Sequence, residues 1–262
     1  MESNEKKYLR DHRSHDITYI LGRWRKTARQ AGLVVETVAE EGGYPVMALT
    51  NRRGAADAPG LYLSAGIHGD EPGAVMGLLE WAEENPDVLR THPVAIFPCV
   101  NPWGLVNNSR EDSAGRDLNR AFDRTCGGPI CAMLDFIEGR SFSVAGSLHE
   151  DYDANGAYLY ELAQRGERPG DRLLERVESV LPRHRGSVDG RRAHNGVIRR
   201  TRGLEAIVKQ IEGMPEAIYL YLHHARTALT FETPSEFSLY RRARAHMKFL
   251  EGVTEMVTGG AG

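Results

Sequence analysis

Short apolar runs alternate with helix-length segments along most of this chain, and this alternation constrains the fold more than any other feature of the sequence. The apolar runs have the length of buried strands, and the longer segments carry apolar residues at helical spacing. Strands that alternate with helices predict an α/β sheet covered by helices on both faces. The expected strands are 60–67, 93–100, 142–150, 157–162 and 227–232, with a hairpin over 33–40 and 44–50, and the expected helices are 71–84, 131–137, 171–181 and 236–257.

The ends of the chain and one long loop complete the expected organisation. Residues 1–30 are polar and are predicted to be helical. Residues 101–120 form a long polar segment, which in a compact domain is typical of a functional or disordered loop. A chain of 262 residues can form one α/β domain or two small ones. We expect a single domain over 1–262, with a C-terminal packing helix at 236–258.

Charge and composition argue against two classes of partner. The formal net charge is -3, so bulk charge predicts neither nucleic-acid nor membrane binding. The polar N-terminus resembles no signal peptide, and no apolar run is long enough for a membrane span. The cysteines are Cys99, Cys126 and Cys131, a low and odd number that favours free thiols and a cytoplasmic location, although Cys126 and Cys131 could pair. Arginine is dense between residues 191 and 202, which is typical of a solvated loop, with a partner-binding surface as the alternative.

Three polar residues each end or directly follow an expected strand: His68, His149 and Glu232. Ligands of α/β sheets bind outside the carboxyl ends of the strands. We therefore expect these side chains to meet at one edge of the sheet, although they are far apart in the sequence.

The turn His68-Gly69-Asp70-Glu71 offers two metal ligands close together. An imidazole and a carboxylate at this spacing can share one ion without closing a long loop. His149 would complete a His₂Glu set and leave one position for water, which separates a catalytic zinc site from a structural one. Each residue alone has an ordinary alternative: a surface histidine, a glutamate favoured at a helix N-terminus, or a hydrogen-bonded histidine.

The segment from Asn101 to Arg120 adds groups that can bind a substrate. It contains Asn101-Pro102, then Arg110, then Asp117-Leu118-Asn119-Arg120. Arginines near a zinc centre can polarise a carbonyl group or bind a carboxylate through two hydrogen bonds. Ordinary surface arginines are the alternative.

The order H-x-x-E, N-P-x-G, Arg, D-x-N-R, strand-L-H and strand-E-T-P resembles the zinc metallocarboxypeptidase family, with its relatives the succinylglutamate desuccinylases and aspartoacylases. The resemblance spans Gly66 to Ser235, and the combination is far more specific than any one motif. It implies a mixed, mostly parallel central sheet with helices on both faces, in a zinc carboxypeptidase-like (phosphorylase/hydrolase-like) fold. It also implies one Zn²⁺ per chain.

The resemblance implies a role for each residue around that metal. His68, Glu71 and His149 correspond to the zinc ligands, and Glu232 corresponds to the general base that acts on the zinc-activated water. Asp117 corresponds to the carboxylate that orients the imidazole of His68.

The resemblance also implies how a substrate is held. Arg110 corresponds to the arginine that polarises the scissile carbonyl, and Asn119 and Arg120 correspond to the pair that binds the terminal carboxylate. The expected substrate is a peptide or an N-acyl amino acid with a free carboxylate.

Two features lack a clear counterpart in that family. The family has a mobile active-site tyrosine; Tyr219 and Tyr221 are the nearest candidates, and His223 and His224 could replace its hydrogen bonds. The acidic run at 150–153 is either a solvated turn or a site for a cationic group of the substrate.

The resemblance leaves three functions open. The first is a carboxypeptidase that removes a C-terminal residue from a small peptide, and the second is a deacylase of an N-acyl amino acid. The third is a non-catalytic binding domain that retains the fold. The deacylase branch carries a β-rich extension after the general base, where this chain has one amphipathic helix. We therefore expect a zinc-dependent hydrolase, a metallopeptidase of the carboxypeptidase type.

Overall fold

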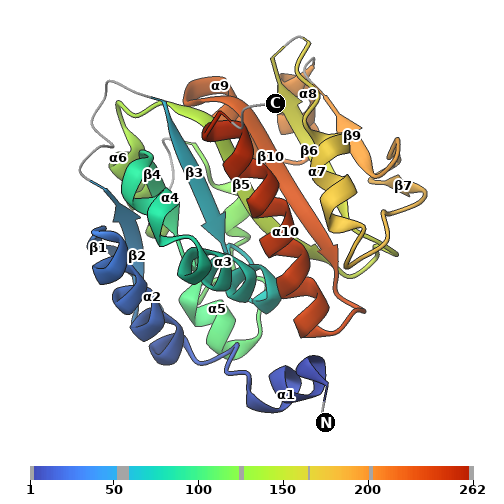
Figure 1. Ribbon diagram of the computed structural model, residues 1–262. Helices are drawn as coiled ribbons and strands as arrows, with labels where there is room; N and C mark the ends of the chain where they lie inside the picture. The colour runs from blue at the N-terminus through green and yellow to red at the C-terminus, as the bar shows by residue number, and fades with distance from the viewer. Residues whose placement is uncertain (1–2, 52–58, 124–126, 165, 201–202, 260–262) are drawn as a thin grey trace.

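A mixed eight-stranded sheet forms the centre of the computed structural model, which describes residues 3–51, 59–123, 127–164, 166–200 and 203–259 (Figure 1). The strand order is β1-β2-β4-β3-β5-β10-β6-β9, and the neighbours β4, β3, β5 and β10 run parallel. The expectation of a mixed, mostly parallel sheet is therefore confirmed. The strands are β1 (Val34–Glu41), β2 (Tyr44–Thr50), β3 (Gly60–Ala65), β4 (Val94–Phe97), β5 (Phe142–Asp151), β6 (Tyr158–Ala163), β9 (Val197–Arg199) and β10 (Ala225–Pro234); β7 (Ser187–Val188) and β8 (Arg191–Arg192) pair separately.

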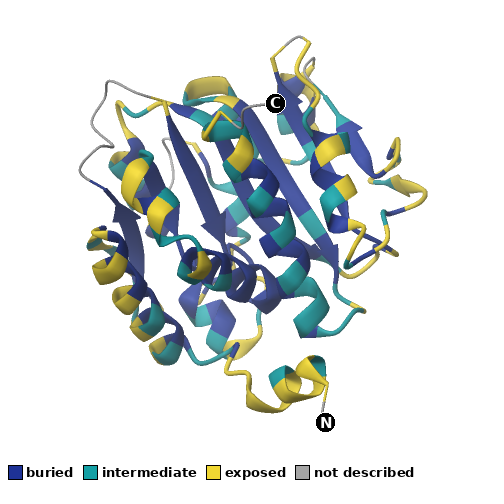
Figure 2. Ribbon diagram, in the orientation of Figure 1, coloured by how far each residue is buried: buried dark blue, intermediate teal, exposed yellow. Residues whose placement is uncertain are grey.

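Helices cover both faces of this sheet because side chains alternate along each strand. Leu61 and Leu63 pack into one core cluster, whereas Tyr62 between them packs into the other. The central strands of the sheet are buried, while most helices expose their outer sides (Figure 2). Helices of the first face are α2 (Ile17–Ala31), α3 (Pro72–Glu84), α4 (Pro86–Thr91), α7 (Gly170–Val177) and α10 (Leu239–Val257), and those of the second are α6 (Pro129–Ile137), α8 (Leu204–Gln210) and α9 (Glu216–His223).

The last helix, α10, packs behind the strands that carry the candidate site. It begins at Leu239, because the side chain of Ser238 accepts the hydrogen bond from Arg241 N and caps the helix there, three residues later than its expected start. Phe249 is fully buried and stacks on Phe231 of β10, with ring centroids 4.5 Å apart.

Two segments expected to be irregular contain regular structure. The segment 101–120 holds α5 (Pro102–Asn107) and the 3₁₀ turn η1 (Leu118–Arg120). The arginine-dense segment supplies β9, the edge strand of the sheet. These elements are too short to show a hydrophobic period in the sequence. N-terminal α1 (Asn4–Asp11) precedes α2, and none of the helices among the described residues is long and apolar enough to cross a membrane.

The cysteines correct one expectation. Cys99 is a free, buried thiol, but Cys131 is disulfide-bonded, and Cys126 lies outside the described residues. A cysteine count does not show which sulfur atoms the fold brings within bonding distance.

Candidate metal centre

The turn after β3 brings two of the predicted metal ligands together. β3 is buried along its whole length, and Gly66, the residue directly after it, has a φ of +62°. His68 follows, and Glu71 stands at the N-cap position of α3, with Pro72 in the first turn. The Glu71 side chain makes no capping hydrogen bond to the helix. Its carboxylate is therefore directed to another partner.

The other predicted residues come from the two neighbouring parallel strands. His149 lies near the end of β5 and is paired in register with Glu232 of β10. Glu232 is in turn paired with Tyr158 of β6. The carboxyl ends of β3, β5 and β10 thus meet at one edge of the sheet, as the sequence predicted.

Both imidazoles direct Nδ1 at the same carboxylate. His68 Nδ1 lies 2.6 Å from Glu71 Oε1, and His149 Nδ1 lies 3.1 Å from Glu71 Oε2. One ligand atom from each of the three buried residues falls within 4.8 Å of the others.

The donor set fits a metal ion. The approach of His149 lacks hydrogen-bond geometry, so the buried Oε2 of Glu71 has no hydrogen-bond partner among the described residues. An unsatisfied buried carboxylate oxygen is costly, and a cation shared with the two Nδ1 atoms would satisfy it. Two imidazole nitrogens and a carboxylate are ligands that Zn²⁺ prefers.

The pKa values of these groups reflect the same concentration of charge. Burial lowers the pKa of His68, but the Glu71 carboxylate and the hydrogen bond to Asp117 outweigh it and raise the pKa to about 9. Burial alone would raise the pKa of Glu71, yet the charges of His68 and His149 bring it to about 2. Desolvation, with repulsion from Glu71, raises the pKa of Glu232 to about 8. The pocket therefore favours positive charge between the three ligands.

Asp117 and Arg110 lie on the outer side of His68. Asp117 Oδ1 is 3.3 Å from His68 Nε2, so the Nδ1 atom of that ring remains directed at Glu71. Arg110 Nη2 donates to Asp117 Oδ2 at 3.0 Å, and its Nη1 is 3.2 Å from His68 Nδ1. The Arg110 guanidinium is thus at the mouth of the cluster and half exposed.

Asn101 explains why Arg110 lies there. Its buried amide Nδ2 donates to the carbonyl oxygens of Arg110 and Glu111, and its Oδ1 accepts from Gly104 N. Gly104 in turn packs on the ligand turn: a Cβ built on Gly69 would lie 1.9 Å from the Gly104 carbonyl carbon. Only glycine at position 69 permits this close approach of the two segments.

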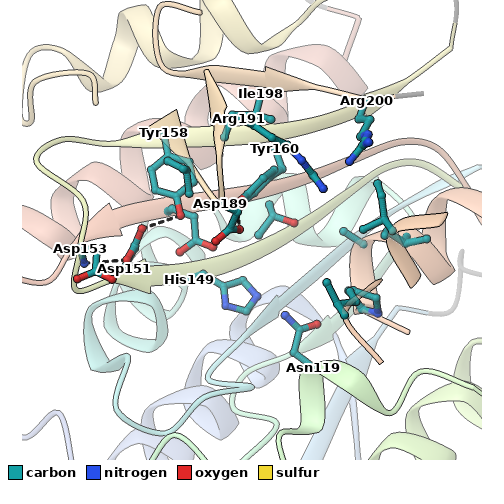
Figure 3. A pocket seen from close by; sticks show the side chains of 18 of the residues that line it. Asn119, His149, Asp151, Asp153, Tyr158, Tyr160, Asp189, Arg191, Ile198 and Arg200 are labelled. Atoms are coloured by element: carbon teal, nitrogen blue, oxygen red, sulfur yellow. Dashed lines mark hydrogen bonds between the residues drawn. The ribbon is translucent and has the colours of Figure 1, made fainter. Parts of the chain in front are cut away.

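Asn119 and Arg120 lie in the wall of a cavity of about 870 Å³ that is also lined by His68, Glu71 and His149. Figure 3 shows Asn119 and His149 in this wall. Asn119 Oδ1 accepts from Glu216 N at 3.0 Å, and its amide nitrogen donates to none of the residues that the structure describes. Arg120 Nη1 donates to the Asn119 carbonyl oxygen at 2.9 Å. The structure therefore brings together all the site residues predicted from the sequence.

The cavity also contains tyrosines that the sequence analysis did not select. Tyr158 and Tyr160 face it from β6 and donate to Asp151 Oδ2 and Asp189 Oδ2, each at 2.8 Å (Figure 3). The alternation of β6 next to the Glu232 strand was the signal that could have identified them. Tyr219, by contrast, packs in the core away from this cavity.

Tyr221, His223 and His224 do not line the cavity. Tyr221 donates to the Ala163 carbonyl oxygen, and His223 and His224 flank a separate hollow. All of the acidic run 150–153 lines the cavity, and Glu150 within it is buried and hydrogen-bonded to Arg242.

Comparison with known proteins supports the resemblance seen in the motifs. Residues 57–133 match the succinylglutamate desuccinylase/aspartoacylase catalytic domain family. No curated protein matches the chain in a sequence search.

Solved structures share the fold. Proposed metallopeptidases from Shewanella amazonensis SB2B and Shewanella denitrificans OS217 both have a TM-score of 0.81, at 22% and 20% identity; the matches cover 93% of this chain and 94% and 91% of theirs. A metallo-carboxypeptidase from Burkholderia cenocepacia has a TM-score of 0.68 at 16% identity, over 92% of this chain and 68% of that one. A metallo-carboxypeptidase from Pseudomonas aeruginosa, in complex with (2-guanidinoethylmercapto)succinic acid, has a TM-score of 0.59 at 20% identity, over 90% and 68%. The carboxypeptidase-like fold expected from the sequence is therefore confirmed.

Proposed function

We propose that this chain is a zinc-dependent amide hydrolase that acts next to a free carboxylate, most simply as a metallocarboxypeptidase. The observation that carries the proposal is the convergence of His68 Nδ1 and His149 Nδ1 on the Glu71 carboxylate, with Glu232 in register beside His149. We also infer that residues 1–262 act as one catalytic domain, because both core clusters pack on the same sheet.

In this proposal His68, Glu71 and His149 hold one zinc ion. When bound there, zinc would act as a Lewis acid towards a water molecule and the substrate carbonyl oxygen. Glu232 faces the same cavity and takes the proton from the attacking water, then passes it to the leaving amine. Burial and the charge of Glu71 raise the pKa of Glu232, which makes its carboxylate a stronger base than that of an exposed glutamate.

Positive groups on the other side of the centre orient the substrate. Arg110 stabilises the negative charge that develops on the carbonyl oxygen, because its guanidinium lies 3.2 Å from His68 Nδ1, at the mouth of the cluster. Arg120 and the free amide nitrogen of Asn119 bind the substrate's terminal carboxylate. Asp117 holds the ring of His68 through Nε2 and holds Arg110 through Oδ2.

A deacylase of an N-acyl amino acid is the second candidate, because the family match over residues 57–133 is to desuccinylase and aspartoacylase catalytic domains. Structural similarity to metallo-carboxypeptidases supports the first candidate, and one of these binds a succinic acid derivative, a ligand that carries carboxylates. Both reactions use the same groups in the same roles.

Metal analysis combined with a substrate screen tests the proposal. The purified chain should contain about one zinc per protein, and His68→Ala should lose it, whereas the exposed His194→Ala should retain it. The zinc-loaded protein should then be assayed against dipeptides, their C-terminal amides and N-acyl amino acids. Cleavage of dipeptides alone identifies a carboxypeptidase, and cleavage of N-acyl amino acids alone identifies a deacylase. Zinc-loaded protein that binds these compounds and cleaves none of them would refute the hydrolase and favour a binding domain.

A further inference from the structure

Arg200 faces the cavity because of its place at the edge of the sheet. β9 runs parallel to β6, with Ile198 paired to Tyr160 and Arg199 paired to Glu161, and Arg200 N continues the pairing through a 3.2 Å hydrogen bond to the Glu161 carbonyl oxygen. Alternation along the strand places Arg199 and Arg200 on opposite faces.

The two arginines have different surroundings. Arg199 donates to Glu161 Oε1 at 2.8 Å and to Asp171 Oδ2 at 2.5 Å, so its charge is fully paired. Arg200 makes no side-chain hydrogen bond or ion pair to any residue that the structure describes, and its Nη1 is buried without a partner. The expectation of a solvated arginine loop is therefore wrong for both residues. The edge strand directs Arg199 towards the carboxylates of Glu161 and Asp171, and it directs Arg200 towards the cavity.

An unpaired guanidinium in a partly buried position is costly unless an anion completes it. Figure 3 shows the Arg200 side chain directed into the cavity, at the end opposite Asp151 and Asp153. No carboxylate of the described residues is bonded to it. An anionic ligand in the cavity would supply the missing partner of the Arg200 guanidinium.

The wall around Arg200 indicates the shape of that ligand. Leu162, Leu204 and Ile207 line the same cavity and offer apolar surface, and Asn119 and Arg120 lie in its wall as well. An aliphatic stem would contact the leucine and isoleucine side chains, and an anionic end would reach the guanidinium. The carboxylates of Asp151 and Asp153 at the far end of the cavity would repel the anionic end of the ligand, and this repulsion would orient the ligand with that end towards Arg200.

We propose that Arg200 is a specificity-determining residue that selects substrates whose carboxyl-terminal residue has an acidic side chain of the glutamate type. The proposal rests on the function proposed above, since Arg120 and Asn119 are taken to hold the α-carboxylate of that same residue. Arg200 then reads the second carboxylate through charge-assisted hydrogen bonds.

Matched substrate pairs test this role. Benzoyl-glycyl-glutamate and benzoyl-glycyl-glutamine differ only in the charge of the terminal side chain, and N-acetylglutamate and N-acetylglutamine form the same pair for a deacylase. For the zinc-loaded parent, kcat/KM should favour the glutamate member by about 10- to 100-fold, the usual worth of a hydrogen-bonded ionic contact. Arg200→Gln should bring this ratio close to one. Arg192→Gln removes an exposed arginine outside the cavity and should keep the parent ratio.

A parent that turns over the glutamine member equally well would overturn the proposal without any variant, and so would a glutamate preference that survives in Arg200→Gln. If neither class is hydrolysed, the proposed function fails, and calorimetric binding of N-acetylglutamate and N-acetylglutamine decides the role of Arg200 separately. Tighter binding of N-acetylglutamate that is lost in Arg200→Gln supports the role, and equal binding of the two compounds refutes it.

Discussion

Replacement of Glu232 by glutamine separates the proton relay from the metal site. Glu232 and His149 are directly paired on neighbouring strands, whose backbones lie about 4.8 Å apart. A carboxylate at this position can reach a water molecule held beside the three ligands. Glutamine has the same shape but cannot take the proton.

The expected effect on turnover is large and the effect on folding is small. Loss of a positioned acid–base group lowers kcat by about 10²–10⁴-fold, or roughly 2.7–5.5 kcal/mol of activation free energy. The Glu232 side chain accepts no hydrogen bond from the residues that the structure describes, and burial raises the pKa of its carboxyl, so replacement by neutral glutamine should not lower the free energy of unfolding at neutral pH.

The assay measures zinc content, urea unfolding and kcat of the same preparation. Glu232→Gln should retain zinc and stability and lose turnover, whereas Glu236→Gln, an exposed acid four residues later, should behave like the parent. A zinc-loaded Glu232→Gln protein with nearly normal turnover would refute the assignment of the base and leave the metal site standing.

Three further changes test other parts of the structure. Phe249→Ala should lower the free energy of unfolding by about 3–5 kcal/mol, because the ring is fully buried and stacked; a neutral result in urea unfolding would contradict that packing. Arg120→Lys should raise KM relative to the parent, since lysine lacks the two-pronged donor of arginine. The parent itself should cleave substrates with a free C-terminal carboxylate faster than their C-terminal amides; equal turnover of acid and amide would argue against carboxylate binding by Arg120. Burial lowers the pKa of His246 from 6.5 to about 3, so between these values the unfolded state binds more protons, and the free energy of unfolding decreases by up to about 1.4 kcal/mol for each unit by which the pH is lowered. His246→Gln should flatten this dependence in denaturation curves from pH 6.5 to 4, while exposed His194→Gln should not; equal slopes in all three proteins would show that His246 is not the cause.

The strand ends were predictable because their signals are local. An apolar run such as 142–150 is long enough to identify a buried strand, and parallel strands in an α/β sheet end on the same side. The meeting of His68, His149 and Glu232 follows from these two facts. The motif order then added Arg110 and the pair after Asp117, which no periodicity would have selected.

The walls of the cavity were not predictable in the same way. β9 has only the residues Val197–Arg199, and such a segment is defined by its partner β6 and not by its own pattern. The surroundings of Arg199 and Arg200 therefore depend on a long-range pairing that the sequence does not display. Helices α8 and α9, which close the same side, are likewise short and were not expected.

The loop that carries the proposed substrate-binding groups contacts the turn that holds the proposed metal ligands His68 and Glu71, and this contact bears on how the site would work. Gly69 N donates to the Ser109 carbonyl oxygen at 2.9 Å, next to the contact between Gly69 and Gly104. Arg110 follows directly, so its guanidinium is positioned relative to His68 by backbone contacts as well as by Asp117. Groups held in this way need little rearrangement when a substrate binds, and that preorganisation is the main source of electrostatic stabilisation in a hydrolytic site. A side chain at Gly69 would separate the two segments, so even Gly69→Ala should impair turnover through Arg110 while all three metal ligands remain in the chain.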